Sequence, residues 1–449
     1  MEKMKEQQHI FTNKMLRTLL IPVIFEQVLN SLMGTVDTMM VSNVGSAAIS
    51  AVSLVDSINV LVIQAFSALA AGGAILCSQY IGQKNHEMAN KSARQVLFII
   101  TAISVAVTAL CLLFRVPLLK LIFGKVESDV MTASQVYFFY TALSFPFIAL
   151  YDAGASIFRS QGNTRGPMTV SVISNVINIG GNAALIWGFN MGVAGAAIAT
   201  VFSQGVSAIL CYIYMMRRFD ILKTTPAERK FDGALARTLM YIGVPMGLQF
   251  SITAIGSIML QSANNALGTA CVAAFTAAMR IKMFFMCPFE SLGMAMATYS
   301  GQNYGAGKPE RIWMGVKASA LMMIVYWAFT FCVLMFGART FALLFVDASE
   351  LEILKNTELF LHISVSFFPV LGLLCILRYT IQGVGYTNLA MLSGVLEMIA
   401  RILVSLLAVP AFGCLAVCFG DPTAWIFADA FLIPAFIYVY RRILRMKKN

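Results

Sequence analysis

The chain has 449 residues, of which 59% are hydrophobic and only 12% are charged, whereas globular proteins carry about 25% charged residues. This composition excludes a soluble enzyme, a nucleic-acid-binding domain and a disordered protein. The hydrophobic share of 449 residues is about 265 positions, enough for about thirteen membrane spans of about 20 residues each. The chain is therefore expected to be an integral membrane protein.

Twelve long hydrophobic stretches follow one another along the chain, without the alternation that marks the strands of a transmembrane barrel. Helices also satisfy every backbone polar group in lipid. The sequence therefore predicts an all-α membrane protein with twelve transmembrane helices. The predicted spans are 16–41, 49–79, 95–114, 134–158, 166–187, 193–216, 238–262, 271–300, 314–338, 357–382, 388–411 and 423–440.

The segments between these spans differ in positive charge. Of the 32 Lys and Arg, 23 fall in one alternating set of segments, which includes both ends of the chain, and 5 fall in the other set. By the positive-inside rule both termini are cytoplasmic. The net charge of +11 is then mostly a topology signal with contact to anionic lipid, and no nucleic-acid partner is expected. The first stretch is too long for a cleaved signal and is predicted to be retained.

Two halves of the chain match in one frame, without gaps, at a shift of 223 residues. Pro22 matches Pro245, and Pro146 matches Pro369. Further matches join Gly45 to Gly268, Gln79 to Gln302, Gly82 to Gly305, Gly162 to Gly385, Thr164 to Thr387 and Met168 to Met391. Shared Pro, Gly and Gln over 150 residues indicate a duplication.

Each repeat holds six predicted helices, so both repeats enter the membrane in the same sense. We expect an N-terminal lobe over 1–216, a cytoplasmic linker over 217–237 and a C-terminal lobe over 238–449. A pseudo-twofold axis along the membrane normal should relate the lobes, with a substrate cavity between them. This is the usual architecture of an alternating-access transporter rather than an enzyme.

The nine cysteines lie mostly inside apolar runs and form no Cys-x-x-Cys motif. They are predicted to be buried thiols. The three histidines are too scattered for a metal site. No organic cofactor is expected.

Ionisable residues inside a membrane are costly and mark function by default. Glu397 and Arg401 are four residues apart and could pair on one helix face. Arg280 and Lys282 need counter-charges, for which Glu290 is a candidate. The remaining acids in the predicted spans are Glu26, Asp37, Asp56, Asp152 and Asp429. Caps or inter-helix hydrogen bonds near helix ends would account for Asp56, Asp152 and Asp429.

Asp37 differs because polar residues on other helices are expected at a similar depth. Asn178 and Asn182 are one turn apart on the fifth predicted helix, and Thr200 lies on the sixth. A carboxylate, two amide oxygens and a hydroxyl would suit Na⁺, and the same carboxylate could carry H⁺ if burial raises its pKa. Alternatively, the asparagines only join helices, as polar residues often do in membranes.

These residues also carry a family resemblance. The segment Thr35–Gly45, which contains Asp37, resembles the first-helix signature of the multidrug and toxic compound extrusion (MATE) transporters. The segments Arg159–Met168, Gly195–Thr200 and Gly243–Gln249 fit the same family in chain order. The resemblance implies export of organic cations and drugs in exchange for H⁺ or Na⁺.

In the prokaryotic branch that the chain resembles, the coupling site implied is Asp37, Asn178, Asn182 and Thr200. Pro22 matches a proline at which the first helix is proposed to bend. The chain departs from the branch at Asn182, where Asp is frequent, and one carboxylate fewer favours H⁺ over tight Na⁺ binding. In the second lobe Leu260, Arg401 and Ser405 replace Asp37, Asn178 and Asn182.

The sequence thus favours a secondary antiporter that moves small molecules, mainly organic cations, by alternating access. It would act as a monomer among membrane lipids, in the bacterial cytoplasmic membrane. Candidate cavity residues are Gln249, Arg280, Glu290 and Arg378.

Two alternatives remain. A flippase of the same superfamily would bind a lipid-linked pyrophosphate through Arg280, Lys282, Arg378 and Arg401. An intramembrane enzyme lacks support, because the sequence has no visible Ser/His, paired-Asp or metal-ligand cluster.

Overall fold

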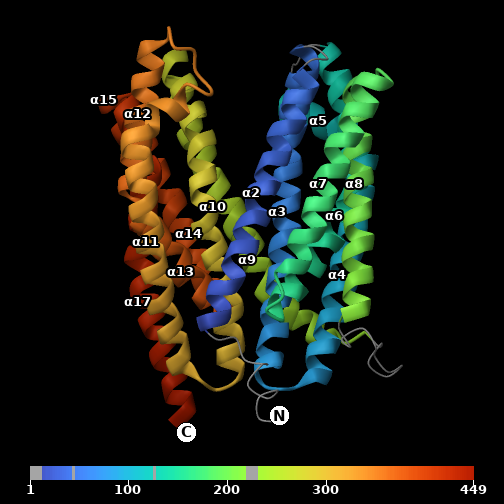
Figure 1. The fold of residues 1–449 in the computed structure, drawn as a ribbon, viewed down its shortest axis with the longest axis vertical. Coiled ribbons are helices and arrows are strands. Elements are labelled where there is room, and N and C mark those ends of the chain that lie inside the picture. Colours follow the sequence, from blue (N-terminus) through green and yellow to red (C-terminus); the bar gives the residue numbers. More distant parts are fainter. Residues whose placement is uncertain (1–12, 43–45, 125–127, 219–230, 449) are drawn as a thin grey trace. The chain divides into compact units, whose positions relative to one another are not determined.

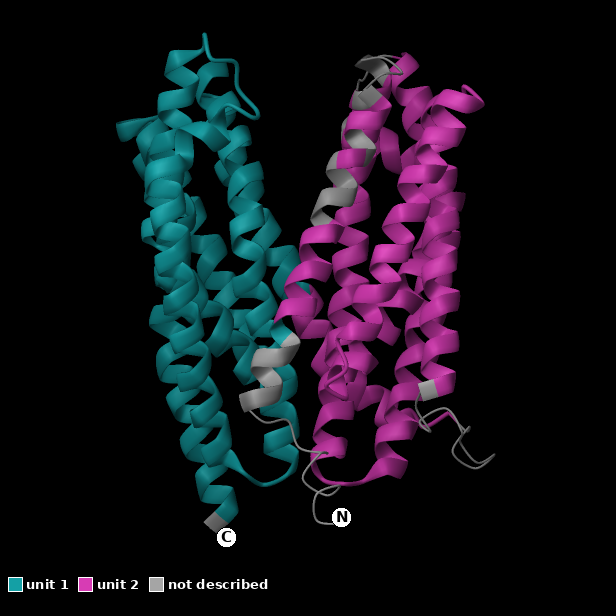
Figure 2. Ribbon diagram, viewed as in Figure 1, with its two compact units in different colours: residues 1–20, 248–449 teal, residues 21–247 magenta. Residues whose placement is uncertain are grey.

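The structure is a computed structural model that describes residues 13–42, 46–124, 128–218 and 231–448. Within these ranges the regular elements are all helices (Figure 1). The chain forms two compact units, which Figure 2 colours separately. Unit 2 comprises 21–247 and unit 1 comprises 1–20 with 248–449. Both boundaries between the units fall inside helices, one in α2 (Asn13–Ser42) and one in α9 (Gly233–Asn265). Because 219–230 lie outside the described residues, the predicted linker over 217–237 stays a prediction.

Unit 2 is built around α6, which packs against α3, α4 and α8, while α7 packs mainly on α8. The helices of its chain region are α2 (Asn13–Ser42), α3 (Ser46–Gly82), α4 (His86–Leu113), α5 (Arg115–Phe123), α6 (Ser128–Ser160), α7 (Arg165–Asn182), the π-helix η1 (Ala183–Gly188) and α8 (Gly192–Arg218).

Unit 1 repeats this packing with α10 against α13, and with α17 against α13 and α14. Its helices are α9 (Gly233–Asn265, which begins in unit 2), α10 (Thr269–Gly305), α11 (Pro309–Ala342), α12 (Leu351–Ser366), α13 (Phe368–Val384), α14 (Thr387–Leu403), the π-helix η3 (Val404–Ala408), α15 (Val409–Phe412), α16 (Cys414–Cys418) and α17 (Gly420–Lys448).

The helix bounds follow the internal repeat. Both ends of α10 lie 223 residues after the ends of α3, and α12 begins 223 residues after α6. The two π-helices also overlap in this frame, since 404–408 less 223 is 181–185. A π-helical turn is rare and often marks a functional site. The repeat therefore extends to local backbone geometry.

Ten helices in the described residues are long and apolar enough to cross a membrane. The prediction of an all-α membrane protein is confirmed. The pair α12 and α13 would add one span, bent by 48°, and α2 contains the apolar helical segment 20–30.

The single helix predicted over 357–382 is wrong in one respect, because the chain breaks at Phe367 between α12 and α13. Pro369 lies in the first turn of α13, where its missing N–H has no partner to lose. Pro146, its counterpart in the repeat, lies inside the unbroken α6. A proline at this position of the repeat is therefore compatible with a continuous helix and with a broken one. Hydropathy cannot distinguish the two.

The prediction of buried thiols is wrong for three of the nine cysteines, two of which are bonded and one of which is exposed. Cys271 and Cys414 form a disulfide that joins the start of α10 to the start of α16. Five of the remaining thiols are buried, whereas Cys332 is exposed. The two bonded residues are 143 positions apart, so their spacing could not reveal the bond.

Candidate functional site

A cluster of neutral polar side chains joins α7 and α8 in unit 2. Asn178 and Asn182 are fully buried. Asn182 Nδ2 donates to Asn178 Oδ1 at 3.2 Å, and Asn178 Nδ2 donates to Thr200 Oγ1 at 3.3 Å. Thr200 in turn donates to the backbone oxygen of Ala196 at 3.0 Å. Three of the four residues proposed from sequence for cation coupling thus form one hydrogen-bonded chain, which we call the asparagine cluster.

The fourth residue, Asp37, lies on α2, but its side chain is outside the described residues. Pro22 lies inside α2 and is buried. Since α2 continues through Pro22, the helix is uninterrupted there. The coupling roles of Asp37 and Pro22 stay predictions.

The polar contacts continue along α7 away from Asn182. Ser174 Oγ donates to the backbone oxygen of Ser203 on α8 at 3.1 Å. Asn175 donates to the backbone oxygen of Ser171 at 2.8 Å, and Ser171 donates to Asn30 on α2 at 2.9 Å. These bonds link α7 to both α8 and α2. The described bonds agree with the interpretation that the asparagines join helices, and the coupling role stays a prediction.

The asparagine cluster offers the oxygen atoms of a hard-cation site, but its three side chains carry no negative charge. Amide and hydroxyl oxygens are ligands that hard cations accept in proteins. Directly after Asn182 the backbone changes to the π-helix η1. The described residues contain no group of three or more His, Cys, Asp or Glu that could hold a metal, so a cation here would depend on amide and hydroxyl oxygens and on one carboxylate.

A second buried group in unit 2 was given no role from sequence. Glu26 on α2 is 1% exposed. Tyr151 donates its hydroxyl hydrogen bond to Glu26 Oε1 at 3.2 Å, and Arg159 Nη1 lies 3.6 Å from the same oxygen. Both partners lie on α6. The spacing of Tyr151 and Arg159, eight residues or about two turns, was a signal that could have placed them on one helix face.

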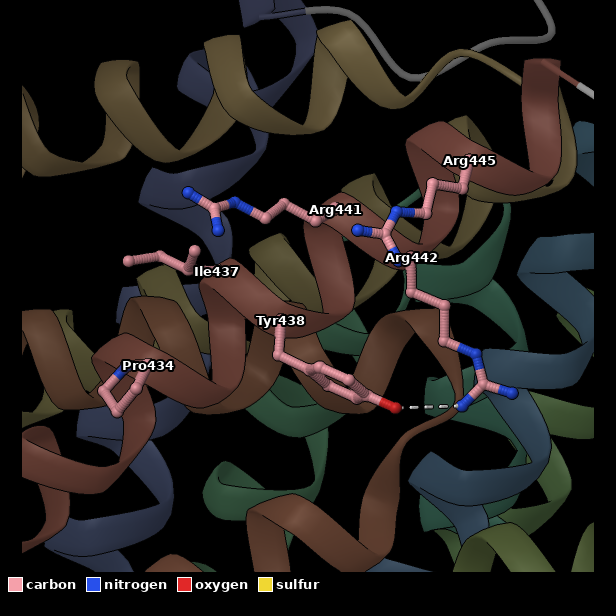
Figure 3. Close-up of a pocket in the computed structure, with 6 residues that line it drawn as sticks. All are labelled: Pro434, Ile437, Tyr438, Arg441, Arg442 and Arg445. Atoms are coloured by element: carbon pink, nitrogen blue, oxygen red, sulfur yellow. Dashed lines mark hydrogen bonds between the residues drawn. The ribbon is translucent and has the colours of Figure 1, made fainter.

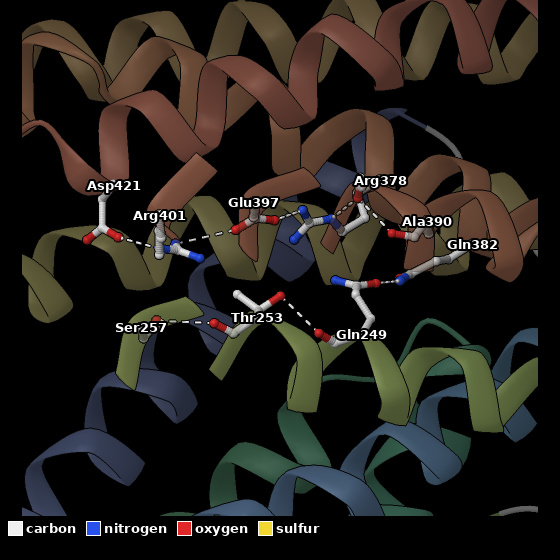
Figure 4. Close-up of polar contacts among 10 residues, drawn as sticks. Gln249, Thr253, Ser257, Arg378, Gln382, Ala390, Glu397, Arg401 and Asp421 are labelled. Atoms are coloured by element: carbon white, nitrogen blue, oxygen red, sulfur yellow. Dashed lines mark hydrogen bonds and ion pairs between the residues drawn. The ribbon is translucent and has the colours of Figure 1, made fainter. Parts of the chain in front are cut away.

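Unit 1 holds a chain of buried ion pairs, which we call the charge network. Figure 4 labels four of its members: Arg378, Glu397, Arg401 and Asp421. Arg401 on α14 bonds Asp421 Oδ1 through Nε at 2.9 Å, and its Nη2 lies 3.4 Å from Glu397 Oε2. Arg378 on α13 pairs with the other oxygen of Glu397, and Lys282 on α10 pairs with the other oxygen of Asp421. All five side chains are buried. The predicted Glu397–Arg401 pair is confirmed.

Aromatic rings and a glycine complete the surroundings of this network. Lys282 Nζ lies 5.2 Å from the centroid of the Phe360 ring and 5.8 Å from that of Trp425. Such rings stabilise a desolvated cation. On α9, a Cβ at Gly256 would lie 2.9 Å from Met398 Cα. Only a glycine there lets α9 approach α14 so closely.

The counter-charge predicted for Lys282 is wrong. Asp421 fills that position, and the side chain of Glu290 is exposed. Asp421 lies just before the span predicted over 423–440, so hydropathy left it in a loop. Arg280 is also exposed, and no acid of the described residues pairs with it.

The other two cavity candidates are buried. Gln249 is 2% exposed and accepts a hydrogen bond from Gln382 Nε2 at 2.8 Å, while Arg378 is 8% exposed and belongs to the charge network. Gln249, Thr253 and Ser257 follow one another at four-residue spacing along α9 (Figure 4). They form a polar stripe on the helix that the family resemblance singled out at Gly243–Gln249.

Three acids were expected to serve as caps or inter-helix partners. Asp56 fits, because Tyr137 on α6 donates to its Oδ1 at 3.3 Å. For Asp429 the expectation is wrong, since neither carboxylate oxygen bonds any described residue. Asp152 has one buried oxygen without such a partner.

Outside the spans, Asp232 stands directly before α9. Lys91 Nζ donates to its Oδ2 at 2.7 Å, and its Oδ1 accepts the backbone N–H groups of Ala234 and Leu235. The bond from Lys91, followed by that from Leu235, holds the pKa of Asp232 below its usual value. Asp232 thus caps α9 and connects its start to α4.

The sequence also matches a family model. The MatE model matches residues 22–184 and 242–407, one segment in each repeat. The chain belongs to the MatE family. It is a multi-pass membrane transporter of the MATE class, which confirms the family resemblance.

Curated relatives cover most of the chain. A probable multidrug resistance protein of Bacillus subtilis, YoeA, is 27% identical over 69% of this chain and 70% of its own. An FAD transporter of Shewanella oneidensis is 24% identical over 76% of this chain and 75% of its own. A probable multidrug resistance protein of Thermotoga maritima, NorM, is 25% identical over 70% of this chain and 68% of its own. One of these relatives is thus named as a transporter and two are named as probable multidrug resistance proteins.

Solved MATE structures share the fold. A crystal structure of MATE in complex with MaL6 matches with a TM-score of 0.90 at 20% identity and covers 99% of both chains. An outward-facing MATE transporter of the MOP superfamily also reaches 0.90, at 20% identity and 98% coverage of both chains. The twelve-helix fold predicted from hydropathy is thereby confirmed.

Proposed function

We propose that this MATE protein exports lipophilic, mainly cationic small molecules, drugs included, in exchange for H⁺ or Na⁺. The observation that carries the proposal is the asparagine cluster, in which Asn178, Asn182 and Thr200 are joined by hydrogen bonds inside the membrane-spanning part of unit 2. The names of two relatives, which denote probable multidrug resistance proteins, support the substrate class. The exchange needs no cofactor besides the coupling ion.

The coupling ion would act at Asp37 with the asparagine cluster. Asp37 supplies the negative charge and the three neutral side chains supply oxygen atoms. A ligand shifts a conformational equilibrium only by its difference in affinity between the states. The ion and the substrate must therefore favour opposite states, with α2, α7 and α8 as the helices that respond. Pro22 inside α2 is the position at which this helix would bend.

The charge network supports the antiporter over the flippase. Lys282, Arg378 and Arg401 are already paired with Glu397 and Asp421. A pyrophosphate would have to displace these buried carboxylates, which is costly. Of the four cations available to the flippase hypothesis, only Arg280 is exposed. The flippase is therefore not favoured.

We further propose that the protein is a monomer in the bacterial cytoplasmic membrane with both termini inside. The 23-to-5 division of Lys and Arg between alternate segments supports this orientation.

Efflux of a cationic dye from proteoliposomes tests the proposal, with H⁺ and Na⁺ gradients imposed separately. We expect one gradient to drive efflux and Asp37→Asn to abolish it. Asp232→Asn is the matched control, because it removes an acid that caps a helix outside the spans. FAD is added as a competitor of dye efflux, because one relative is named as an FAD transporter.

Efflux by Asp37→Asn at the wild-type rate would contradict the coupling role of the acid. Failure of both gradients would exclude the antiporter. Transport of FAD in the absence of dye transport would replace the cationic substrate class by an anionic one.

A further inference from the structure

The last helix, α17, has two distinct faces. Residues at spacings of three and four, such as Trp425, Leu432 and Phe436, are buried in the core of unit 1. The opposite face is exposed and apolar over most of its length, with Ile433 and Ile437 at 42% and 41% exposure. Beyond it follow Tyr438 and three arginines. This face therefore changes from apolar to aromatic to cationic along the helix axis.

A groove of about 530 Å³ lies on this exposed face (Figure 3). Pro434 and Ile437 form its apolar end and Tyr438 its middle. Arg441, Arg442 and Arg445 form the other end. Arg441 and Arg445 are four residues apart, so their side chains leave the helix on the same side.

Among the described residues no carboxylate pairs with Arg441, Arg442 or Arg445, whereas the nearby Lys447 is paired with Glu310 at 2.6 Å. Arg442 donates to the Tyr438 hydroxyl at 3.5 Å, and its guanidinium lies 5.6 Å from the Tyr386 ring centroid. Arg441 and Arg445 therefore remain available for an anion from outside the protein.

We propose that this groove binds one anionic phospholipid, with its phosphate on Arg441 and Arg445 and an acyl chain along Ile437 and Pro434. A guanidinium binds phosphate oxygens in a two-pronged geometry, and tyrosine is typical of the level between head groups and chains. A zwitterionic lipid offers the same chains without net negative charge. The positive-inside count predicts that the occupied leaflet is the cytoplasmic one.

Lipid retention on the purified full-length protein tests this site. Detergent-solubilised protein is titrated with phosphatidylglycerol or phosphatidylcholine, and bound lipid is measured by native mass spectrometry. We expect phosphatidylglycerol to be retained preferentially, and R441Q with R445Q to weaken its binding about thirtyfold, or about 2 kcal/mol. Equal thermal unfolding of wild type and variant establishes that the exposed substitutions leave the fold intact.

R217Q with R237Q is the matched control, because it removes two exposed arginines near helix ends that belong to α8 and α9 and do not line the groove. It should leave lipid binding unchanged. The proposal is overturned if the groove variant binds phosphatidylglycerol like the wild type, if the control loses as much affinity, or if phosphatidylcholine binds equally well. Glycerol 3-phosphate, a head group without acyl chains, should not compete with phosphatidylglycerol for the groove. Equal competition would show that the acyl chain contributes nothing to binding.

Discussion

Positions that match at the 223-residue shift of the internal repeat carry chemically different side chains in the two units. Asn178 of the asparagine cluster matches Arg401 of the charge network, and both precede a π-helix. In unit 2 the side chains of the asparagine cluster are neutral and share hydrogen bonds of 3.2 and 3.3 Å. In unit 1 the cations are neutralised by carboxylates of the protein itself. One duplicated scaffold thus carries a cluster of neutral polar side chains in one repeat and a set of mutually paired charges in the other.

The energetics of the two sites differ accordingly. A buried ion pair contributes little net stability over apolar side chains, but removal of one partner leaves an uncompensated buried charge. Polar contacts between membrane helices are worth less, about 0.6 kcal/mol on average. We therefore expect substitutions in unit 1 to act mainly on stability, and substitutions in unit 2 to act mainly on transport.

The largest expected effect is that of Arg401→Ala, which leaves Glu397 and Asp421 with one buried partner fewer each. We expect a loss of about 3–5 kcal/mol in unfolding free energy, measured as a lowered midpoint of thermal unfolding in detergent. Ser405→Ala is the control, since Ser405 only donates to the backbone of Arg401 at 2.7 Å. Equal midpoints for the two variants would show that the network is not a stabilising unit.

The disulfide is a second difference between the units, because Ala48 and Met191 occupy the frame positions of Cys271 and Cys414. A cross-link between residues 143 positions apart restricts the unfolded chain strongly. Cys414→Ser should therefore cost about 2–5 kcal/mol in thermal unfolding. Cys332→Ser, at an exposed thiol outside the bond, should cost nothing measurable. Insensitivity of the wild type to reductant would argue against the bond.

Disulfides form in oxidising compartments. The predicted topology places the starts of α10 and α16 outside the cytoplasm, so the bond and the positive-inside count agree. Alkylation of the cysteines with a membrane-impermeant reagent, before and after reduction, would test both the bond and the side of the membrane on which it lies.

An asymmetric exchange of residues would sharpen the comparison further. Asn182→Asp adds a carboxylate to the asparagine cluster and should shift coupling from H⁺ towards Na⁺, because a second charge strengthens hard-cation binding. The ratio of dye efflux under the two gradients measures this shift, with about a tenfold change expected for about 1.4 kcal/mol. Ser405→Asp, at the matching position of unit 1, should leave the ratio unchanged. If both variants changed the ratio equally, the asparagine cluster of unit 2 would have no specific role in ion coupling.

The sequence predicted what depends on local pattern. Continuous hydropathy located the spans, and a spacing of four residues identified the Glu397–Arg401 pair. Asn178, Asn182 and Thr200 were grouped from their depth on neighbouring helices. Contacts between distant positions were beyond reach: Asp421 lies 139 residues from Lys282. The break at Phe367 was missed because both of its helices are equally apolar.

The smallest expected effect concerns the start of α9, where Asp232 binds Lys91 in unit 2 at 2.7 Å. The pKa of Asp232 is held below its usual value by this bond. Its contribution to stability is therefore present above the pKa of the unfolded chain, about 3.9, and is lost as the pH falls through the lower pKa of the folded protein. Asp232→Asn should lower the thermal midpoint slightly at pH 7, and the difference from wild type should shrink below pH 4. Because both side chains are partly exposed, salt should reduce the difference as well. A difference that grows towards acidic pH would mean that the carboxylate destabilises α9, and that the connection between α4 and α9 rests on apolar packing alone.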